Sequence, residues 1–133
     1  MNKNISAKKR FGQNFLTDVL LLDQLAKYIN PSNSENFLEI GPGLGALTDH
    51  ILSKPKNYIA VELDRDLIAI LENKFFFKEN FQIINKNILD LNLGDYADKK
   101  NKIRLVGNLL YNLSSPILEW CFDQIELIED MHF

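Results

Sequence analysis

The first amphipathic stretch of the chain covers residues 17–29, with the sequence TDVLLLDQLAKYI. Its apolar positions recur every three or four residues and share one face of a helix: Val19, Leu22, Leu25, Ala26 and Ile29. Thr17 is the predicted N-cap, because its hydroxyl can accept a hydrogen bond from a free backbone N–H. Pro31 cannot continue a helix, so we expect the helix to end before it.

Further along, short extended segments alternate with helical ones. The predicted strands are rich in β-forming residues and cover 37–40, 57–62, 81–84 and 103–107. Predicted helices cover 46–53 and 65–75, the second capped by Asp64. Another helix is expected to begin with Ser115 as N-cap and Pro116 in the first helical position. Strands that alternate with helices predict an α/β fold with an open, doubly wound, mostly parallel sheet.

The last residues, 130–133, resemble the start of a fifth strand that stops. A sheet that ends after the fourth strand leaves that strand with a bare edge, which native sheets normally avoid. The sequence therefore predicts a sheet truncated after its fourth strand, and we interpret the chain as part of a longer protein.

Composition suits one folded domain. The chain has 133 residues, of which 46% are hydrophobic and 25% charged. No apolar run is long enough to span a membrane, and no apolar stretch follows the basic N-terminus as in a secretory signal.

Cys121 is the single cysteine and has no disulfide partner, which fits a cytoplasmic protein. His50 and His132 lack Cys or His partners at metal-ligand spacing, so we predict no metal site.

The formal net charge of −3 is a poor match for nucleic acid as a whole, but the positive charge is uneven. It is concentrated at residues 8–10 and in a later group, Lys99, Lys100, Lys102 and Arg104. Residues 8–10 suit either phosphate contacts or a solvated terminus. We expect the three phenylalanines at 75–77 to pack into the core rather than form a stacking platform, and Trp120 and Cys121 to be core residues as well.

The segment EIGPGLG at 39–45 follows a predicted strand and opens a predicted helix. Gly41, Gly43 and Gly45 let the backbone turn sharply and approach a ligand closely, because no Cβ intervenes. Glu62 ends the next predicted strand, where its carboxylate can accept hydrogen bonds from two ribose hydroxyls. These features predict a cofactor site on the loop.

Two cofactors satisfy this pattern. Gly41, Gly43 and Ala46 fit the dinucleotide fingerprint, in which a pyrophosphate sits at the helix N-terminus. S-adenosylmethionine has a ribose and an adenine but carries a sulfonium and an amino group instead of phosphates. Glu39 on the first strand suits these cationic groups and would repel a pyrophosphate, which favours S-adenosylmethionine. A glycine-rich turn without a ligand is the remaining alternative.

A second segment, GNLLYNLSSP at 107–116, follows the fourth predicted strand and so belongs to the same carboxyl edge of the sheet. The amide oxygen of Asn108 can accept a hydrogen bond from the amino group of a planar base, and the ring of Tyr111 can stack on that base. On their own, an asparagine in a turn and a tyrosine in the core explain the pair equally well.

Four segments occur together in the order and spacing of one known family: KKRFGQNFLTD at 8–18, FLEIGPGLGALT at 37–48, VELDRDL at 61–67 and GNLLYNLSSPI at 107–117. They resemble the ribosomal RNA adenine N6,N6-dimethyltransferases, above all the bacterial type that methylates two adjacent adenines near the 3′ end of 16S rRNA. The resemblance covers nearly the whole chain. It implies a Rossmann-like S-adenosylmethionine-dependent methyltransferase fold, with a cofactor-covering segment at 1–16 and a core at 17–133. The family's complete enzymes add C-terminal strands and a small helical domain.

The resemblance also implies a partner and a set of site residues. The partner is the 16S rRNA of the small ribosomal subunit, bound by a full-length monomer without membrane or metal. The implied cofactor contacts include Asn14, Leu16, Gly41, Glu62 and, at the adenine amino group, Asn87. Asn108 would lie between the cofactor and the target base, Tyr111 would stack on that base, and the Leu110 carbonyl would be a second acceptor.

The chain departs from the family pattern at two of these positions. Asn87 stands where an aspartate is usual, and asparagine keeps one acceptor oxygen but loses the charge. Leu110 stands where a proline is usual, and a leucine leaves φ free. We therefore expect a weaker adenine contact and a less rigid loop.

The implied reaction is direct transfer of a methyl group to adenine N6. Hydrogen bonds that aim the N6 lone pair would carry most of the catalysis, and no strong general base is needed. Three alternatives stay open: a resistance-type methyltransferase that acts on large-subunit rRNA, a non-catalytic RNA-binding or ribosome-assembly factor on the same scaffold, and a nicotinamide-dependent oxidoreductase supported by the glycine fingerprint alone.

Overall fold

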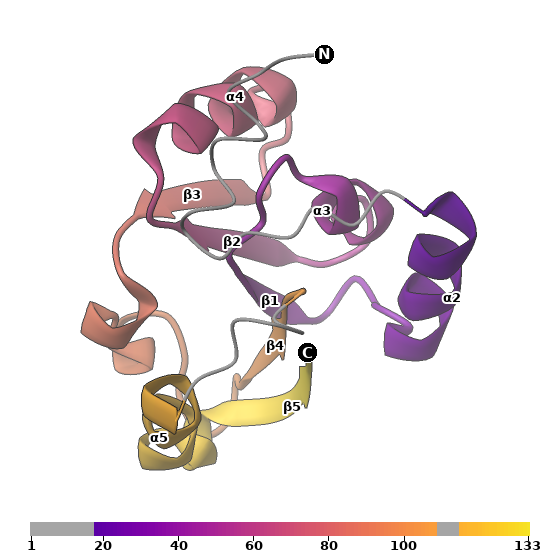
Figure 1. Cartoon of the computed structure of the whole chain (residues 1–133). Coiled ribbons are helices and arrows are strands. Elements are labelled where there is room, and N and C mark those ends of the chain that lie inside the picture. Colours follow the sequence, from indigo (N-terminus) through magenta and orange to yellow (C-terminus); the bar gives the residue numbers. More distant parts are fainter. Residues whose placement is uncertain (1–17, 109–114) are drawn as a thin grey trace.

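A parallel five-stranded sheet forms the centre of the computed structural model, which describes residues 18–108 and 115–133 (Figure 1). The strands are β1 Asn36–Ile40, β2 Asn57–Glu62, β3 Phe81–Asn85, β4 Ile103–Val106 and β5 Ile128–His132. Their order in the sheet is β3-β2-β1-β4-β5, and all neighbours are parallel. The chain winds outward in both directions from β1, so the topological switch point lies between β1 and β4.

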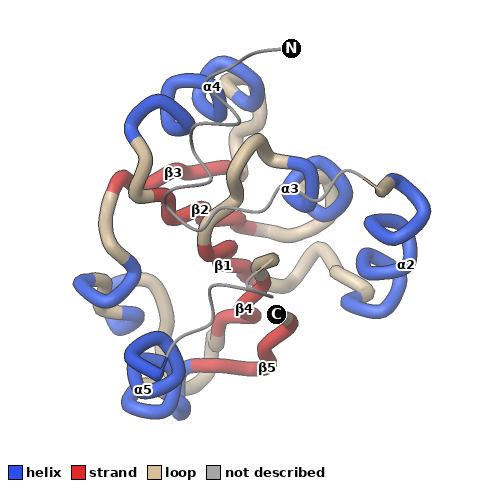
Figure 2. Tube along the Cα trace, viewed as in Figure 1, coloured by secondary structure: helices blue, strands red, loops and turns tan. Residues whose placement is uncertain are grey.

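Helices cover both faces of this sheet, as the doubly wound prediction requires (Figure 2). The α-helices are α2 Val19–Ile29, α3 Ala46–Ile51, α4 Arg65–Phe75 and α5 Ser115–Asp123. The 3-10 helices are η2 Ile88–Asp90, η3 Leu93–Asp95 and η4 Ile125–Leu127. Helices α2, α3 and α4 share a core with Phe37 and Tyr58 of the sheet, whereas η2, η3 and α5 share a second core with Leu38 and Leu105.

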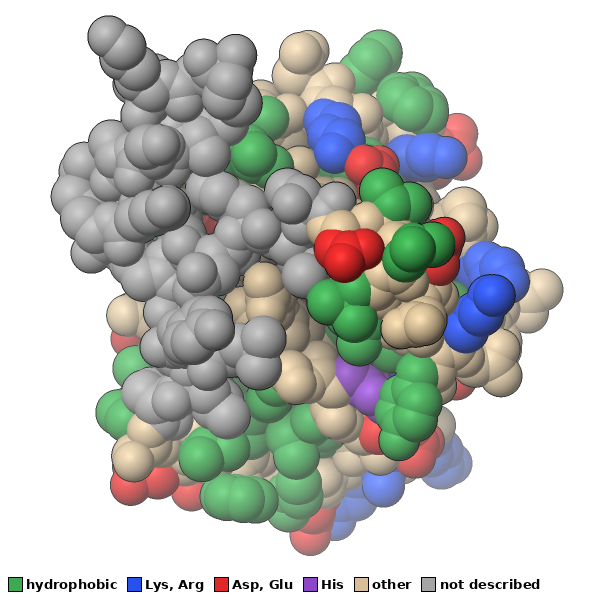
Figure 3. Space-filling view, turned by 45° about the vertical axis from the view of Figure 1, so that its right-hand side comes forward, with side chains coloured by type: hydrophobic (Ala, Val, Ile, Leu, Met, Phe, Trp, Pro, Cys, Tyr) green, Lys and Arg blue, Asp and Glu red, His purple; other side chains and the backbone are tan. Residues whose placement is uncertain are grey.

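Burial on both faces explains the nearly unbroken apolar sequence of the central strand. Phe37 and Leu38 point to opposite faces of β1, and both side chains are fully buried. Parallel strands covered on two sides require apolar residues at successive positions. Three charged side chains of the described residues are buried, Glu39, Glu62 and Arg104. On the face shown in Figure 3, basic and acidic side chains are interspersed.

Strand β5 corrects the predicted end of the sheet, because β4 has neighbours on both of its sides. Acidic residues are unusual in a paired strand, and the contacts of β5 explain why they are tolerated there. The Arg104 guanidinium donates from Nε to Asp130 Oδ1 at 2.9 Å and from NH1 to Glu35 Oε1 at 3.0 Å. Arg104 also donates to the backbone carbonyl of Ile29 at 2.6 Å, so it joins β4, β5 and the end of α2.

Helix α2 begins one residue later than predicted, and its cap is Asp18 rather than Thr17. The Asp18 carboxylate accepts hydrogen bonds from the N–H groups of Leu20 and Leu21, at 3.0 and 3.2 Å. A carboxylate is a stronger acceptor than a hydroxyl for these groups. The helix ends before Asn30, which adopts a left-handed conformation with φ of 50°.

The other helices agree with the sequence in position; α4 has the predicted bounds, and α3 and α5 each differ at one end. Asp64 caps α4 as predicted and accepts a hydrogen bond from Asp66 N–H at 2.9 Å. Helix α3 stops at Ile51, two residues before the predicted end. Ser115 is the first helical residue of α5 rather than its cap, so Pro116 occupies the second helical position.

The three phenylalanines at the end of α4 divide into one core residue and two exposed ones. Phe75 is 3% exposed, as predicted, but Phe76 and Phe77 are 81% and 62% exposed. Helix α4 ends at Phe75, so the next two residues leave the face that packs on the sheet. Trp120 and Cys121 are buried, as predicted.

Candidate active site

The register of the sheet brings the segments that follow the first four strands to one edge, as predicted. Glu39 pairs with Val106 across β1 and β4, and Glu62 pairs with Asn85 across β2 and β3. Glu62 therefore shares the carboxyl edge with the residues just beyond these pairs: Gly41, Asn87 and Asn108. Four other predicted site residues lie outside the described residues: Asn14, Leu16, Leu110 and Tyr111.

The glycine loop at 41–45 has backbone conformations that residues with a Cβ rarely adopt. Gly41, Gly43 and Gly45 have φ of 65°, 61° and 84°, all in the left-handed region. A Cβ on Gly41 would meet no atom within 4 Å, so the backbone here faces open space that a ligand can approach. A Cβ on Gly45 would instead come within 2.9 Å of Phe75 Cε2. The two glycines thus differ in role, because Gly45 allows α4 to pack closely against the loop.

Glu62 at the end of β2 is only 3% exposed, and backbone groups fix its carboxylate. Oε1 accepts a hydrogen bond from Gly43 N–H at 3.3 Å, and Oε2 accepts one from Asp64 N–H at 2.9 Å. Burial raises the pKa of Glu62, and these N–H groups oppose part of that rise. Each oxygen keeps a further lone pair, so the carboxylate can still accept hydrogen bonds from two hydroxyls.

Asn85 supports this strand end and was missed by the sequence analysis. Its side-chain amide donates to the backbone carbonyls of Glu62 and Leu63, at 3.0 and 3.1 Å. The available signal was its position, because a polar residue that ends β3 lies opposite the acid that ends β2.

Glu39 lies beneath the glycine loop, 2% exposed, in the interface between the sheet and α3. Its Oε1 accepts hydrogen bonds from Thr48 Oγ1 at 2.5 Å and from the Tyr58 hydroxyl at 2.8 Å. Burial raises the pKa of Glu39 to about 7, although both hydrogen bonds act to lower it. Burial and the Glu39 charge also raise the pKa of Tyr58 well above its ordinary value. Thr48 and Tyr58 were not predicted, although both are polar residues at core positions.

The two asparagines of the edge differ in their local partners. Asn87 caps η2, and its Oδ1 accepts a hydrogen bond from Leu89 N–H at 3.0 Å. Asn108 is half-buried and follows Gly107, whose N–H donates to the His132 carbonyl of β5 at 3.0 Å. Strand β5 therefore anchors the chain directly before Asn108.

Within residues 18–108 and 115–133, no helix has the length and apolar character needed to cross a membrane. The same residues contain no group of three or more His, Cys, Asp or Glu side chains that could hold a metal ion.

Comparison with known families identifies this arrangement. The family model described as ribosomal RNA adenine dimethylase matches residues 4–133. The chain belongs to the ribosomal RNA adenine dimethylase family. This dimethylase-family chain is 44% identical over 134 residues to ribosomal RNA small subunit methyltransferase A of Hahella chejuensis, covering 99% of the chain and 49% of the relative. It is 43% identical over 131 residues to the protein of the same name from Coxiella burnetii, covering 98% and 50%.

The dimethylase-family chain therefore spans about half the length of the curated relatives it matches. Among solved structures it resembles the 23S rRNA methyltransferase ErmE, with a TM-score of 0.74, 26% identity, and coverage of 89% of this chain and 47% of that one. It also resembles a dimethyladenosine transferase from Plasmodium falciparum, with a TM-score of 0.69, 20% identity, and coverage of 83% and 38%. These likenesses confirm the predicted Rossmann-like methyltransferase fold.

Proposed function

We propose that this chain carries the cofactor-binding part of an S-adenosylmethionine-dependent rRNA methyltransferase that dimethylates N6 of two adjacent adenines near the 3′ end of 16S rRNA. The observation that carries the proposal is the carboxyl edge of the sheet. There the fixed Glu62 carboxylate and the open backbone of Gly41 lie on the same edge as Asn108. The identity of 43–44% to small-subunit methyltransferases favours 16S over 23S rRNA, and with that partner we place the activity in the cytoplasm.

The described residues fit S-adenosylmethionine better than a dinucleotide. Glu39 is buried next to the loop and would repel a pyrophosphate once its carboxyl is ionised. The oxygens of Glu62 are positioned to accept hydrogen bonds from ribose hydroxyls, and Gly41 leaves space for the cofactor to approach. The proposed cofactor contacts are Asn14, Leu16, Glu39, Gly41, Gly43, Gly45, Glu62, Asn87 and Asn108. When bound, S-adenosylmethionine supplies a methyl group attached to a positively charged sulfur.

The chain's own catalytic task is to hold and aim the target base. The amide oxygen of Asn108 and the backbone carbonyl of Leu110 accept the two N6–H hydrogens, which keeps the N6 lone pair out of the ring system and directs it at the methyl group. Tyr111 stacks on the base and offsets part of the cost of taking it out of its helix. Positioning of this kind supplies most of the rate without a strong general base.

The test separates cofactor binding from transfer in two variants. Calorimetric titration measures S-adenosylmethionine affinity, and labelled methyl groups measure transfer to small ribosomal subunits that lack the modification. Glu62→Gln should weaken affinity about tenfold, because hydrogen bonds to a charged acceptor are the stronger ones. Asn108→Ala should cut transfer about 100-fold with little change in affinity, as for loss of one aimed hydrogen-bonding group.

Equal losses of affinity and transfer in Asn108→Ala would contradict the base-aiming role. Methyl transfer to large-subunit rRNA instead would assign the chain to the resistance type. No binding of S-adenosylmethionine by the unmodified chain would favour the non-catalytic assembly factor.

A further inference from the structure

Lysines gather in the loops at the amino edge of the sheet, the edge opposite to the candidate active site. The loops that lead into β2, β3 and β4 carry six of them: Lys54, Lys56, Lys78, Lys99, Lys100 and Lys102. The described part of the chain contains 11 of the 15 lysines and arginines, because Lys3 and residues 8–10 lie outside it. More than half of its positive charge therefore lies in three neighbouring loops of a chain whose net charge is −3.

These lysines are available to an outside partner. Among the described residues, only Lys99 of the six forms an ion pair, with Glu126 at 3.2 Å. Its side chain is 74% exposed and that of Glu126 71%, so the pair contributes little. The other five form no ion pair within the described ranges. The same three loops hold two acids, Glu79 and Asp98, so the six lysines are in excess, and this excess favours a polyanion as the partner.

Hydrogen bonds hold the lysine loops in place. Asn80 donates from its side-chain amide to the carbonyls of Leu52 and Pro55, at 2.9 and 3.0 Å, and so ties the loop before β3 to the loop before β2. Asp98 accepts hydrogen bonds from the N–H groups of Lys100 and Asn101, at 2.8 and 2.7 Å, which lower the pKa of its carboxyl. These hydrogen bonds therefore fix the backbone of the loops that carry the lysines.

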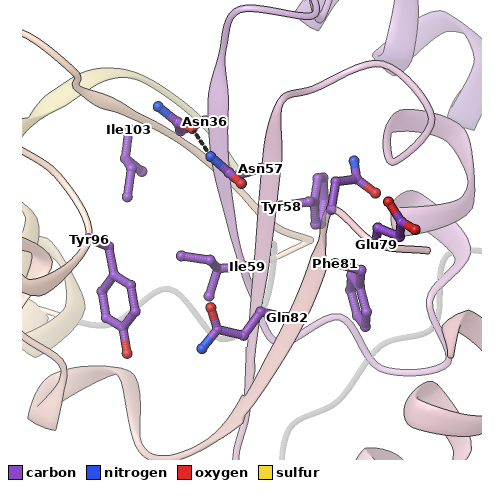
Figure 4. A pocket seen from close by; sticks show the side chains of 10 residues that line it. Asn36, Asn57, Tyr58, Ile59, Glu79, Phe81, Gln82, Tyr96 and Ile103 are labelled. Carbon is purple, nitrogen blue, oxygen red and sulfur yellow. Dashed lines mark hydrogen bonds between the residues drawn. The ribbon is translucent and has the colours of Figure 1, made fainter. Parts of the chain in front are cut away.

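A pocket of about 250 Å³ opens between these loops, at the amino ends of β1, β2 and β3 (Figure 4). Asn57 donates from its side-chain amide to Asn36 Oδ1 at 2.8 Å, and each of these amides keeps its other polar atom, one acceptor and one donor. Tyr96, Ile59 and Gln82 line the neighbouring wall. Pockets for drug-sized ligands measure about 300–1,000 Å³, so this one suits a group the size of one nucleobase.

Two exposed aromatic rings belong to one of the lysine loops, the loop that leads into β3. Phe76 and Phe77 belong to the loop whose next residues, Glu79 and Asn80, line the pocket. Their rings are nearly perpendicular, with centroids 5.5 Å apart, and Lys78 Nζ lies 5.3 Å from the Phe77 centroid. Aromatic rings flanked by cations are the usual stacking platform for unpaired bases.

We propose that this amino edge is a second contact surface for single-stranded RNA. The lysines bind phosphates, Phe76 and Phe77 stack on bases, and the pocket between Asn36, Asn57 and Tyr96 takes one base by its polar edge. The surface rests on the proposed function, since it would hold a further stretch of the rRNA substrate on the side of the sheet away from the transferred methyl group.

The test is the salt dependence of RNA binding by the whole chain. Fluorescence anisotropy with a labelled oligoadenylate of about 12 nucleotides gives the affinity at several salt concentrations. Each single change at the edge, such as Lys56→Gln, Lys78→Gln or Lys102→Gln, should lower the slope of log affinity against log salt by about 0.7. Lys27→Gln removes the same charge from α2 and should leave the slope unchanged.

Stacking has its own pair of variants. Phe76→Leu keeps an apolar side chain but removes the ring, and it should weaken oligoadenylate binding about fivefold or more. Leu20→Ala is the matched control, because Leu20 is 75% exposed on α2, away from the lysine loops. Thermal unfolding of each variant verifies that the fold is intact, which exposed positions should preserve.

Equal effects of Lys27→Gln and the edge lysines would overturn the proposal. A second result would also overturn it: a polyglutamate chain of the same charge that binds as tightly as the oligoadenylate and loses as much affinity in Phe76→Leu. That result would assign the surface to an acidic protein. Cofactor binding distinguishes the two proposals. If S-adenosylmethionine binds through Glu62 but the lysine changes have no effect, only the RNA surface is wrong. If the lysine effects appear without cofactor binding, only the proposed function is wrong.

Discussion

The two glutamates at the carboxyl edge of the sheet are buried and held by defined partners, whereas the lysines at the amino edge lie on the surface. Glu39 and Glu62 are 2% and 3% exposed, and burial raises the pKa of both carboxyl groups. The lysines of the amino edge lie on surface loops. Even the ion pair that Lys99 forms with Glu126 is exposed to solvent. The carboxyl edge therefore has a fixed geometry, and burial of its carboxyl groups lowers the stability of the fold. The lysines of the amino edge stay in water and hardly affect that stability.

This difference follows from the parallel sheet. All strands end at the carboxyl edge, where the chain turns from β1 into α3 through the glycine loop and from β2 into α4 through Asp64. Glu39 and Glu62 are enclosed there by the helices that follow. At the amino edge the chain returns from the helices through surface loops, which tolerate variation in sequence. Catalytic geometry is thus expected at the first edge and accessory contacts at the second.

The largest effect is expected at Arg104, the exception to this pattern because it lies near the amino edge but is buried and paired. Arg104→Ala leaves Asp130 and Glu35 without their cation and should lower the free energy of unfolding by about 3–4 kcal/mol. The Asp130 side chain is 38% exposed, which keeps the loss toward the lower end of the range for buried pairs. Urea denaturation measures it. Lys100→Ala is the contrasting variant, and a change beyond about 0.5 kcal/mol there would erase the distinction.

A smaller effect separates two glycines of the same loop. Gly45→Ala combines an unfavourable φ with a Cβ 2.9 Å from Phe75 Cε2, so it should lower the free energy of unfolding by about 3 kcal/mol. Gly41→Ala has only the backbone penalty, about 1–2 kcal/mol. Gly41→Ala should nevertheless weaken S-adenosylmethionine binding more than its loss of stability explains. The added methyl group would enter the open space through which the cofactor approaches the loop. Denaturation and calorimetric titration measure both, and equal costs of the two changes would contradict the assigned roles.

The smallest effect concerns the pH dependence of stability. Between its unfolded pKa near 4.5 and its folded pKa of about 7, Glu39 keeps its proton in the folded chain and loses it in the unfolded chain. Stability therefore falls as the pH rises through this range, by about 2 kcal/mol between roughly pH 5 and pH 8.

Glu39→Gln cannot ionise, yet its amide oxygen can still accept from Thr48 and Tyr58. This variant should have a flatter stability profile in urea denaturation over the same pH range. Glu62, whose pKa is also raised, contributes a residual slope of the same sign. A profile as steep as that of the unmodified chain would show that Glu39 is not the group that titrates.

Local patterns explain what could be predicted from the sequence. The strands around Leu38 and Ile59 and the turn at Gly41 are specified by residues within a few positions, and all appear where expected. The sequence indicated the start of a strand at residues 130–133, but the pairing of β5 with β4 could not be predicted, because the group that stabilises Asp130 is Arg104, 26 residues earlier in the chain. A distant partner of this kind leaves no local signal.

The same reasoning applies to the site. The position of Glu62 follows from local order, since an acid at the end of the second strand must lie beside the loop after the first. The partners of Glu39 could not be predicted, because Thr48 comes from the next helix and Tyr58 from the neighbouring strand. The exposure of Phe76 follows from the end of α4 at Phe75, which was predicted correctly, because residues beyond a helix end leave the face that packs on the sheet.

The hydrogen bond from Gly41 N–H to the Val61 carbonyl, 2.9 Å long, continues the pairing of β1 and β2 into the first residue of the loop. Exchange of this amide proton with deuterium requires the two central strands to separate, which is among the costliest openings a domain can undergo. The base of the loop is thus as slow to open as the sheet itself, and any adjustment to an incoming ligand must take place in the residues that follow.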